Sequence, residues 1–266
     1  MEGLTFIGTA TTLIRYAGIT VLTDPNFLHR GQRAYLGKGL WSTRLTEPAL
    51  AVEELPPLDA VVLSHLHGDH FDRVARRGLG RDAPVVTTPA AARRLSRWGF
   101  FCRPLQTWES WTLHKDDARL RVTALPGRHA PGALRKAFPP VMGSLLEFSG
   151  GGVPPLRLYL SGDTLVHDDL RQIAVRHPDL DLGVLHLGGT RVLGLLLTMD
   201  GRQGVDLLEL LRPAVAVPIH HDDYGVFRSP LSDFLAEVDR RRPPSRVVTV
   251  GRGETMPLPV PEHWAN

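Results

Sequence analysis

The segment that decides the fold is Ser64-His65-Leu66-His67-Gly68-Asp69-His70 of a 266-residue chain. It follows the apolar run Asp59–Ser64, which is typical of a buried strand, and it precedes a predicted helix that begins near Phe71. Imidazole and carboxylate side chains are ligands for zinc, manganese or iron. The plain alternative is a chance cluster of solvated polar residues. Four such side chains at one strand end favour a metal site instead.

The spacing within this segment is suited to two neighbouring ions. His65 and His67 are two residues apart, so they point the same way if the chain is still extended there. Gly68 permits a sharp reversal of the backbone. Asp69 and His70 can then face a second ion.

Further ligand-type residues follow three later apolar runs. They are His129 after Arg119–Leu125, Asp163 after Leu156–Ser161, and His220 after Ala214–Ile219. Taken singly, each histidine has a plain alternative as a solvated loop residue, and Asp163 has one as a turn residue. Taken together with the histidine-rich segment, they are predicted to belong to the same site.

The pattern His65-Leu66-His67-Gly68-Asp69-His70, with those three residues in this order, resembles the signature of the metallo-β-lactamase superfamily. The resemblance implies an α+β fold, an αββα sandwich of two mixed β-sheets flanked by helices, and we expect residues 1–266 to form a single domain of this kind. By the same resemblance, one ion is held by His65, His67 and His129, the second by Asp69, His70 and His220, and Asp163 bridges them.

The resemblance also implies a chemistry. Two divalent metal ions, zinc with manganese or iron as alternatives, would ionise a bridging water that attacks an ester, lactone or phosphodiester. Pro218–Tyr224 and Ser161–Thr164 resemble bacterial hydrolases grouped near ascorbate-phosphate lactonase and N-acylethanolamine phospholipase D. A nonhydrolytic metal-binding or sensing protein on the same fold is the second interpretation.

Other residues near the expected ligands are candidates for further roles. Because neighbouring residues on a strand alternate sides, we expect His220 and not His221 to be a ligand. Asp69, His221 and Tyr224 are the catalytic candidates, and His186 is another possible proton donor; for the last three, a packing role is the alternative. Asp24 either holds the second nitrogen of a ligand histidine or starts a turn before Pro25.

The remaining elements follow from hydrophobic periodicity. Further strands are expected at Leu4–Gly8, Thr12–Ala17, Ile19–Thr23, Met142–Phe148, Asp181–His186 and Arg246–Val250, and helices at Phe71–Arg77, Pro89–Trp98, Asp200–Leu211 and Pro230–Arg241. Gly150–Pro155 is interpreted as a hairpin loop. The cleft walls are expected from Pro25–Pro57, Pro131–Pro140 and Arg191–Met199, with Arg30, Arg33, Lys38, Arg135 and Lys136 as possible anion-attracting residues. The apolar run Val192–Leu197 is expected to line the pocket, form a dimer contact or join the core.

Composition limits the partners. The formal charge of +3 comes from scattered basic residues, so we expect a small-molecule substrate, anionic if the charge matters, and no nucleic acid. Cys102 is the single cysteine, the N-terminus lacks a basic signal-peptide region, and no apolar run reaches the ~20 residues of a membrane span. These features favour a cytoplasmic protein, and homo-oligomerisation is left open.

Overall fold

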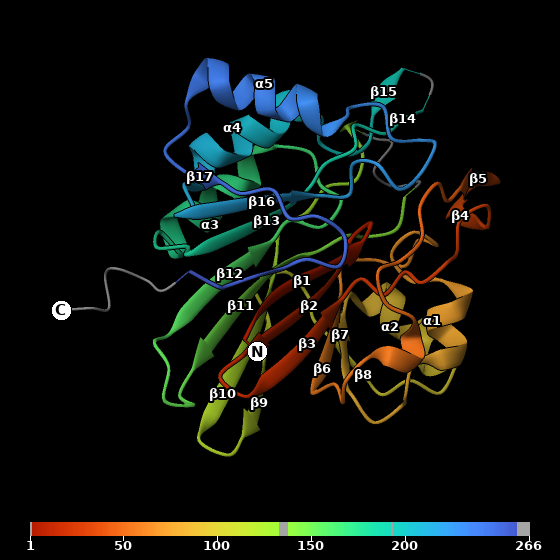
Figure 1. Ribbon diagram of the computed structural model, residues 1–266, viewed down its shortest axis with the longest axis vertical. Helices are drawn as coiled ribbons and strands as arrows, with labels where there is room; N and C mark the ends of the chain where they lie inside the picture. Colours follow the sequence, from red (N-terminus) through yellow and green to blue (C-terminus); the bar gives the residue numbers. More distant parts are fainter. Residues whose placement is uncertain (1, 133–137, 193, 260–266) are drawn as a thin grey trace.

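The computed structural model describes residues 2–132, 138–192 and 194–259. Its two main sheets have seven strands each and pack face to face, with helices on both outer faces (Figure 1). This is the αββα sandwich of two mixed sheets that the sequence predicts.

The first sheet combines a meander with parallel strands. Its order is β18 (Thr255–Met256), β1 (Gly3–Gly8), β2 (Thr11–Tyr16), β3 (Ile19–Thr23), β6 (Ala60–Leu63), β7 (Val85–Thr87) and β8 (Cys102–Pro104). Strands β18 to β3 are antiparallel, and β3 to β8 are parallel. Parallel neighbours need crossover connections, and α1 (Arg73–Gly78) and α2 (Pro89–Ser96) lie in the connections that follow β6 and β7.

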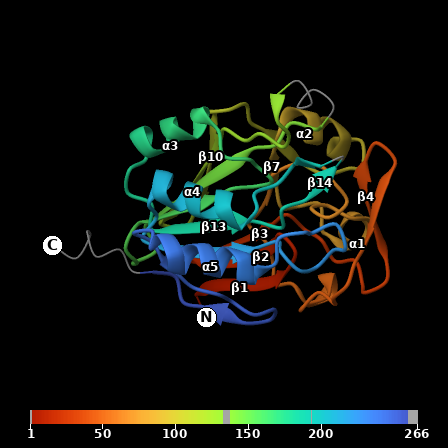
Figure 2. The same ribbon diagram turned by 90° about the horizontal axis from the view of Figure 1, so that it is seen from above.

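The second sheet repeats this plan. Its order is β17 (Arg246–Val247), β16 (Val215–Ile219), β13 (Leu182–His186), β12 (Leu156–Leu160), β11 (Gly143–Ser149), β10 (Ala118–Leu125) and β9 (Ser110–Lys115). Strands β9 to β12 are antiparallel, and β12 to β17 are parallel. The crossovers contain α3 (Arg171–Arg176), α4 (Gly201–Leu211) and α5 (Leu231–Arg241), of which α4 and α5 pack side by side (Figure 2).

The central strands are buried on both faces, and this explains why their sequences are continuously apolar. On β3, Val21 packs in the core between the sheets, while Leu22 packs in the cluster under α1 and α2. On β6, Val62 and Val61 divide in the same way. A strand buried on two faces shows an unbroken apolar run instead of alternation.

The structure corrects several expectations about elements. The stretch Pro25–Pro57, expected as a long loop at the cleft wall, contains the hairpin β4 (Arg33–Gly37) and β5 (Leu40–Thr43) and a 3₁₀ turn, Val52–Glu54. The helix expected from Phe71 begins at Arg73, since the Asp72 side chain accepts hydrogen bonds from the amides of Val74 and Ala75 and so caps it.

Several short elements were missing from the prediction. They are β7, β8, β9, β18, α3 and the small hairpin of β14 (Arg191–Val192) and β15 (Leu195–Leu196). Their two to six residues give too few positions for a periodic signal. The loop Gly150–Pro155 does connect the antiparallel strands β11 and β12, as expected.

Candidate metal centre

Polar residues gather where six strands of the two sheets end. Asp24 follows β3, His65 follows β6, His129 follows β10, Asp163 follows β12, His186 ends β13 and His220 follows β16. All six are buried. The carboxyl ends of the parallel strands meet at one edge of each sheet, so residues from distant parts of the chain come together there.

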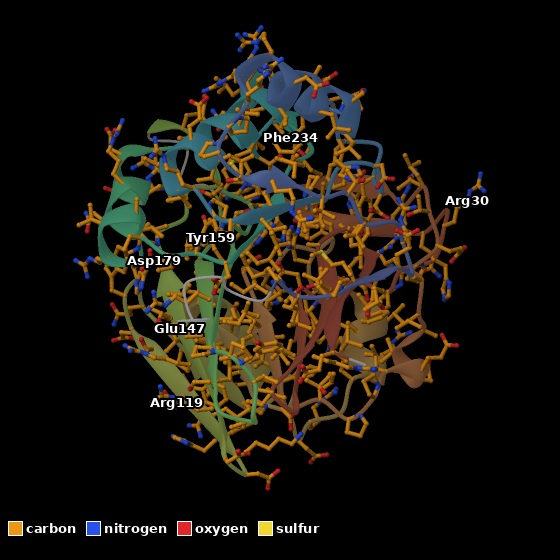
Figure 3. The ribbon with its side chains drawn as sticks, turned by 60° about the vertical axis from the view of Figure 1, so that its left-hand side comes forward. Arg30, Arg119, Glu147, Tyr159, Asp179 and Phe234 are labelled. Carbon is orange, nitrogen blue, oxygen red and sulfur yellow. The ribbon has the colours of Figure 1, made fainter. Side chains whose placement is uncertain are left out.

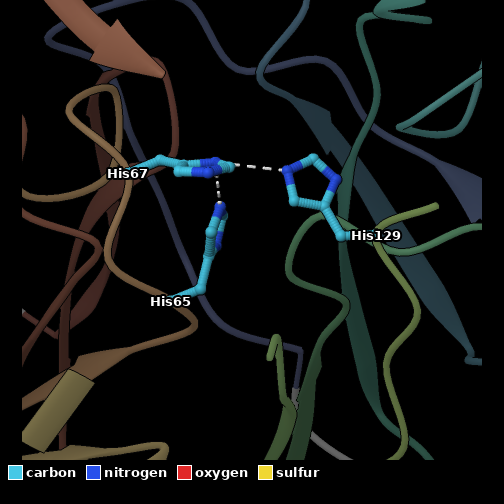
Figure 4. Close-up of side chains that lie close together, drawn as sticks. All are labelled: His65, His67 and His129. Atoms are coloured by element: carbon cyan, nitrogen blue, oxygen red, sulfur yellow. Dashed lines mark hydrogen bonds between the residues drawn. The ribbon is translucent and has the colours of Figure 1, made fainter. Parts of the chain in front are cut away.

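Three histidines form the first group. The Nε2 of His65 lies 3.0 Å from the Nδ1 of His67, and the Nε2 of His129 lies 3.2 Å from the same Nδ1 (Figure 4). His65 Nδ1 faces the Ser64 hydroxyl at 3.0 Å, and His129 Nδ1 faces the carbonyl oxygen of Leu197 at 3.1 Å.

These outer contacts determine which ring nitrogens carry protons. The carbonyl of Leu197 can only accept, so Nδ1 of His129 is protonated and its Nε2 presents a lone pair. The Ser64 hydroxyl lies 3.0 Å from a carboxylate oxygen of Asp24, to which it donates, so His65 Nδ1 is the donor in its own contact. The Nδ1 of His67 carries at most one proton, although it faces the lone pairs of both His65 Nε2 and His129 Nε2. A cation between the three nitrogens would satisfy all of them.

The second group contains Asp69, His70, Asp163 and His220, whose ligand atoms lie within 4.8 Å of one another. His220 Nδ1 donates to the carbonyl oxygen of Leu187 at 3.1 Å, which leaves Nε2 facing Asp69 Oδ2 at 3.6 Å. Asp69 Oδ1, His70 Nε2, Asp163 Oδ1 and His220 Nε2 are all buried without a hydrogen-bond partner among the described residues. Buried polar atoms normally have partners, so four that converge fit a bound cation.

Asp163 lies between the two groups. Its Oδ2 is 3.3 Å from His70 Nε2 and 4.0 Å from His129 Nε2. A carboxylate in this position can offset the repulsion between two neighbouring cations.

The charges of the cluster also favour cations. Although burial opposes ionisation, His220 and His70 lower the pKa of Asp163 well below its ordinary value. Burial would lower the pKa of His70, but Asp163, Asp69 and Asp24 together raise it well above the usual range. Burial and the neighbouring His129 lower the pKa of His67 to about 4. Ionised carboxylates and a neutral His67 are the states that metal binding requires, and a bound cation would take the place of the proton on His70 Nε2 among the three carboxylates.

Asp24 supports the second group from behind. One of its oxygens lies 3.2 Å from His70 Nδ1 and 3.3 Å from His186 Nε2, and the other accepts from the Ser64 amide at 2.7 Å. The His70 proton therefore faces Asp24, so that Nε2 is left for the site. His186 also contacts the Ser161 hydroxyl at 3.2 Å and belongs to this supporting layer.

The two histidines at the end of β16 lie in different surroundings. The backbone of His220 is left-handed, with φ of 63°. A turn of the chain, and not the alternation of side chains along a strand, therefore directs His220 into the second group. His221 lies outside the three candidate metal groups found among the described residues, and its Nδ1 is 3.7 Å from Asp222.

Tyr224 is buried behind the site. Its hydroxyl donates to Asn26 Oδ1 at 3.0 Å, and burial raises its pKa. Asn26 in turn donates to the carbonyl oxygen of Gly68 at 2.9 Å, between two expected ligands. Sequence reasoning missed Asn26 and the role of Ser64, because only the folded chain brings Asn26 against the ligand segment and Asp24 against Ser64.

A cavity of about 120 Å³ opens onto both groups. Each of the three predicted wall segments contributes to it, with Leu36, Leu40 and Trp41 from the β4–β5 hairpin, Phe138, and Arg191, Val192 and Leu197 from the β14–β15 region. Arg191 is the one basic side chain among the described residues of this wall, and it pairs with Asp200 at 3.2 Å. Of the apolar run, Val192 and Leu197 line the cavity, while Leu195 is exposed.

The predicted anion-attracting residues divide. Arg30 projects outward from the surface (Figure 3) and does not line the cavity, whereas Arg33 and Lys38 line a neighbouring groove. Arg135 and Lys136 lie outside the described residues. Within the described chain, none of the helices has the length and apolar character needed to cross a bilayer.

Several known proteins are similar to this chain in sequence. The family model for the β-lactamase superfamily domain matches residues 20–221. An uncharacterised Mycobacterium tuberculosis protein is 28% identical over 265 residues, which are 97% of this chain and 66% of that protein, so the chain spans just under two thirds of this relative. A Deinococcus radiodurans protein described as a UPF0173 metal-dependent hydrolase is 29% identical over 195 residues, covering 72% of this chain and 78% of its own.

Solved structures show the same fold. The isothiocyanate hydrolase from Delia radicum gut bacteria superposes with a TM-score of 0.78 at 22% identity, covering 97% of this chain and 99% of its own. Igni18, a metallo hydrolase from Ignicoccus hospitalis, superposes with a TM-score of 0.69 at 22% sequence identity. The match covers 95% of this chain and 96% of the Igni18 chain. By its match to the family model over residues 20–221, the chain belongs to the metallo-β-lactamase superfamily.

Proposed function

We propose that this protein is a dinuclear hydrolase that cleaves an ester, lactone or phosphodiester bond in a small molecule. The observation that carries the proposal is the pair of adjacent, buried ligand groups with Asp163 between them. His65, His67 and His129 would hold one divalent cation, and Asp69, His70 and His220 the second, with Asp163 shared. Zinc is the metal that we propose, because imidazole and carboxylate donors suit it. The same donors, without thiolate, also suit manganese or iron, which are the alternatives.

The cations would lower the pKa of a shared water toward ~7 and stabilise negative charge that develops on the substrate. The chain's own residues make this possible by their arrangement. Leu197, Leu187 and Asp24 fix the protonated nitrogens of their histidines and aim the other nitrogen inward. Asp69 has one carboxylate oxygen without a hydrogen-bond partner among the described residues, which suits it to orient the attacking water.

The cavity walls favour an apolar group next to the scissile bond. Leu36, Trp41 and Phe138 line the opening, and Arg191 is paired with Asp200. The hydroxyl of Tyr224 is engaged by Asn26, and His186 faces Asp24, so both suit positioning better than proton donation. His221 stays a candidate donor, because its Nδ1 has no hydrogen-bond partner among the described residues.

The test is a panel of 4-nitrophenyl esters, lactones and bis(4-nitrophenyl) phosphate, combined with metal analysis. We expect two equivalents of metal per chain and turnover that disappears after chelation and returns on adding the metal. The matched control is His114→Ala, which removes a histidine from β9, outside the candidate metal groups. Metal-loaded protein that turns over no member of the panel would favour the nonhydrolytic, sensing interpretation instead.

A further inference from the structure

A second cavity adjoins the metal centre. It has a volume of about 430 Å³ and lies between the β4–β5 hairpin and helices α1 and α2. Leu36, Trp41, His67 and Phe138 line both this groove and the cavity over the metal groups. A substrate can therefore occupy both spaces at once, with Trp41 and Phe138 at the passage.

The groove carries an uncompensated positive charge. Five basic side chains line it, namely Arg33, Lys38, Arg73, Arg76 and Arg94. None of them has a carboxylate within 4.0 Å in the part of the chain that the structure describes, although arginines elsewhere do, such as Arg241 with Asp206. The single acidic residue among the lining residues is Asp72.

Asp72 offsets at most one of the five positive charges, and it forms no ion pair with these cations. One of its oxygens accepts from the amides of Val74 and Ala75, and the other accepts from the amides of Phe27 and Leu28. Its negative charge is therefore committed to four backbone donors at the start of α1 and in the preceding loop.

Trp98 holds two of the arginines in place. The guanidinium carbon of Arg76 lies 4.2 Å from the centre of the Trp98 ring, and that of Arg94 lies 5.4 Å from it. A guanidinium that packs on an aromatic ring keeps its N–H edges free, and those edges match the oxygens of a phosphate or carboxylate. Because the ring restricts both side chains before binding, less conformational entropy is lost when an anion arrives.

We infer that this groove binds an oxyanion, a phosphate or a carboxylate, carried by the substrate at a distance from the bond that is cleaved. Arg76 and Arg94 bind the anion, and the apolar linker passes Trp41 and Phe138 to place the scissile bond over the metal groups. The inference about cleavage rests on the proposed function, whereas the anion binding by Arg76 and Arg94 does not. The groove thus selects substrates with a neutral reactive end and an anionic far end.

Three matched substrates test this inference. They are 4-nitrophenyl hexanoate, the mono-4-nitrophenyl ester of adipic acid and 4-nitrophenyl 6-phosphonooxyhexanoate, which differ in the far end alone. We expect KM to be roughly tenfold lower for a charged ester than for the neutral one, since charge-assisted hydrogen bonds are the stronger class. The ester with the larger advantage identifies carboxylate or phosphate as the preferred group.

The variant is Arg76→Glu with Arg94→Glu, and the control is Arg77→Glu with Arg93→Glu, which makes the same changes on α1 and α2 outside the groove. The variant should lose the advantage of the charged esters while keeping kcat and the KM of the neutral ester. The control should keep the advantage. Equal KM values for neutral and charged esters in the unaltered protein would overturn the inference while leaving the hydrolase intact.

Calorimetric titration of hexyl phosphate into the metal-loaded protein separates the two proposals. Binding that depends on Arg76 and Arg94, without turnover of any ester, lactone or phosphodiester of the panel, would refute the proposed function and support the groove. Binding that is equal in the variant and the control would overturn the groove. A single-stranded oligonucleotide that binds through the same arginines more tightly than hexyl phosphate would also overturn it, in favour of a nucleic-acid surface.

Discussion

Replacing Asp24 with asparagine should weaken metal binding at the second group without unfolding the protein. Asp24 is buried and has one oxygen next to the Ser64 amide and hydroxyl, and the other next to His70 and His186. An ionised carboxylate accepts from all four donors. His70 and His186 in turn lower the pKa of Asp24 to about 2 despite its burial, so the carboxyl is ionised at neutral pH.

The asparagine variant has one acceptor and one donor in place of two acceptors. If its oxygen faces Ser64, its amide group faces His70 Nδ1 and favours the tautomer that carries the proton on Nε2, which cannot bind a metal. If its oxygen faces His70, its amide group opposes the Ser64 amide. Loss of such a supporting partner typically lowers metal affinity ~10–100-fold, which corresponds to roughly 1.4–2.7 kcal/mol.

Metal competition against a fluorescent chelator measures the affinity, and circular dichroism checks folding. The control is Asp59→Asn at the opposite end of β6, where the carboxylate contacts Lys115 and the Thr20 amide. We expect the control to keep its metal affinity. Unchanged affinity for both ions in Asp24→Asn would refute the assignment of Asp24 as the group that orients His70.

Four further outcomes are expected. His220→Ala should lose one of the two metal equivalents and His221→Ala should lose none, as measured by elemental analysis; the reverse would mean that the chosen histidine is wrong by one position. Asp163→Asn should abolish most turnover while the urea midpoint changes little, because the amide keeps the shape but not the charge; near-normal kcat with both metals bound would contradict a bridging role. Arg44→Met should cost ~1–3 kcal/mol in urea unfolding, since it removes one of the two cations of the fully buried Asp223, at 3.4 Å, and leaves Arg252 at 3.1 Å as the other. Burial raises the pKa of Asp223, but Arg44 and Arg252 lower it below the unfolded value, so its stabilisation is present above pH ~4 and is lost as pH falls through the folded pKa; the stability difference between Asp223→Asn and the unaltered protein should therefore shrink in acid.

The αββα architecture followed from the family resemblance, and the residues that carry this resemblance form a local signal. His65 to His70 stand between an apolar strand and a helix, and this order is legible in a few residues. The same holds for His129, Asp163 and His220, each of which follows a predicted strand. Short elements such as α3 and β7 escaped prediction, since tertiary packing and not local periodicity stabilises them.

Other features depend on residues that are distant along the chain. Asp24 had two equal interpretations from sequence, and the contact with His70, 46 positions later, exists because β3 and β6 are neighbours in one sheet. Arg76 and Arg94 carry no motif, and they face one groove because Trp98 and the β4–β5 hairpin fold against their helices. The sequence by itself therefore determined which strand each ligand-type residue follows along the chain, and the fold that this pattern implies. Only the tertiary structure decided which polar side chains orient those ligands and which cations stay unpaired, because hydrogen bonds and charge compensation depend on distances of a few ångströms across the two sheets.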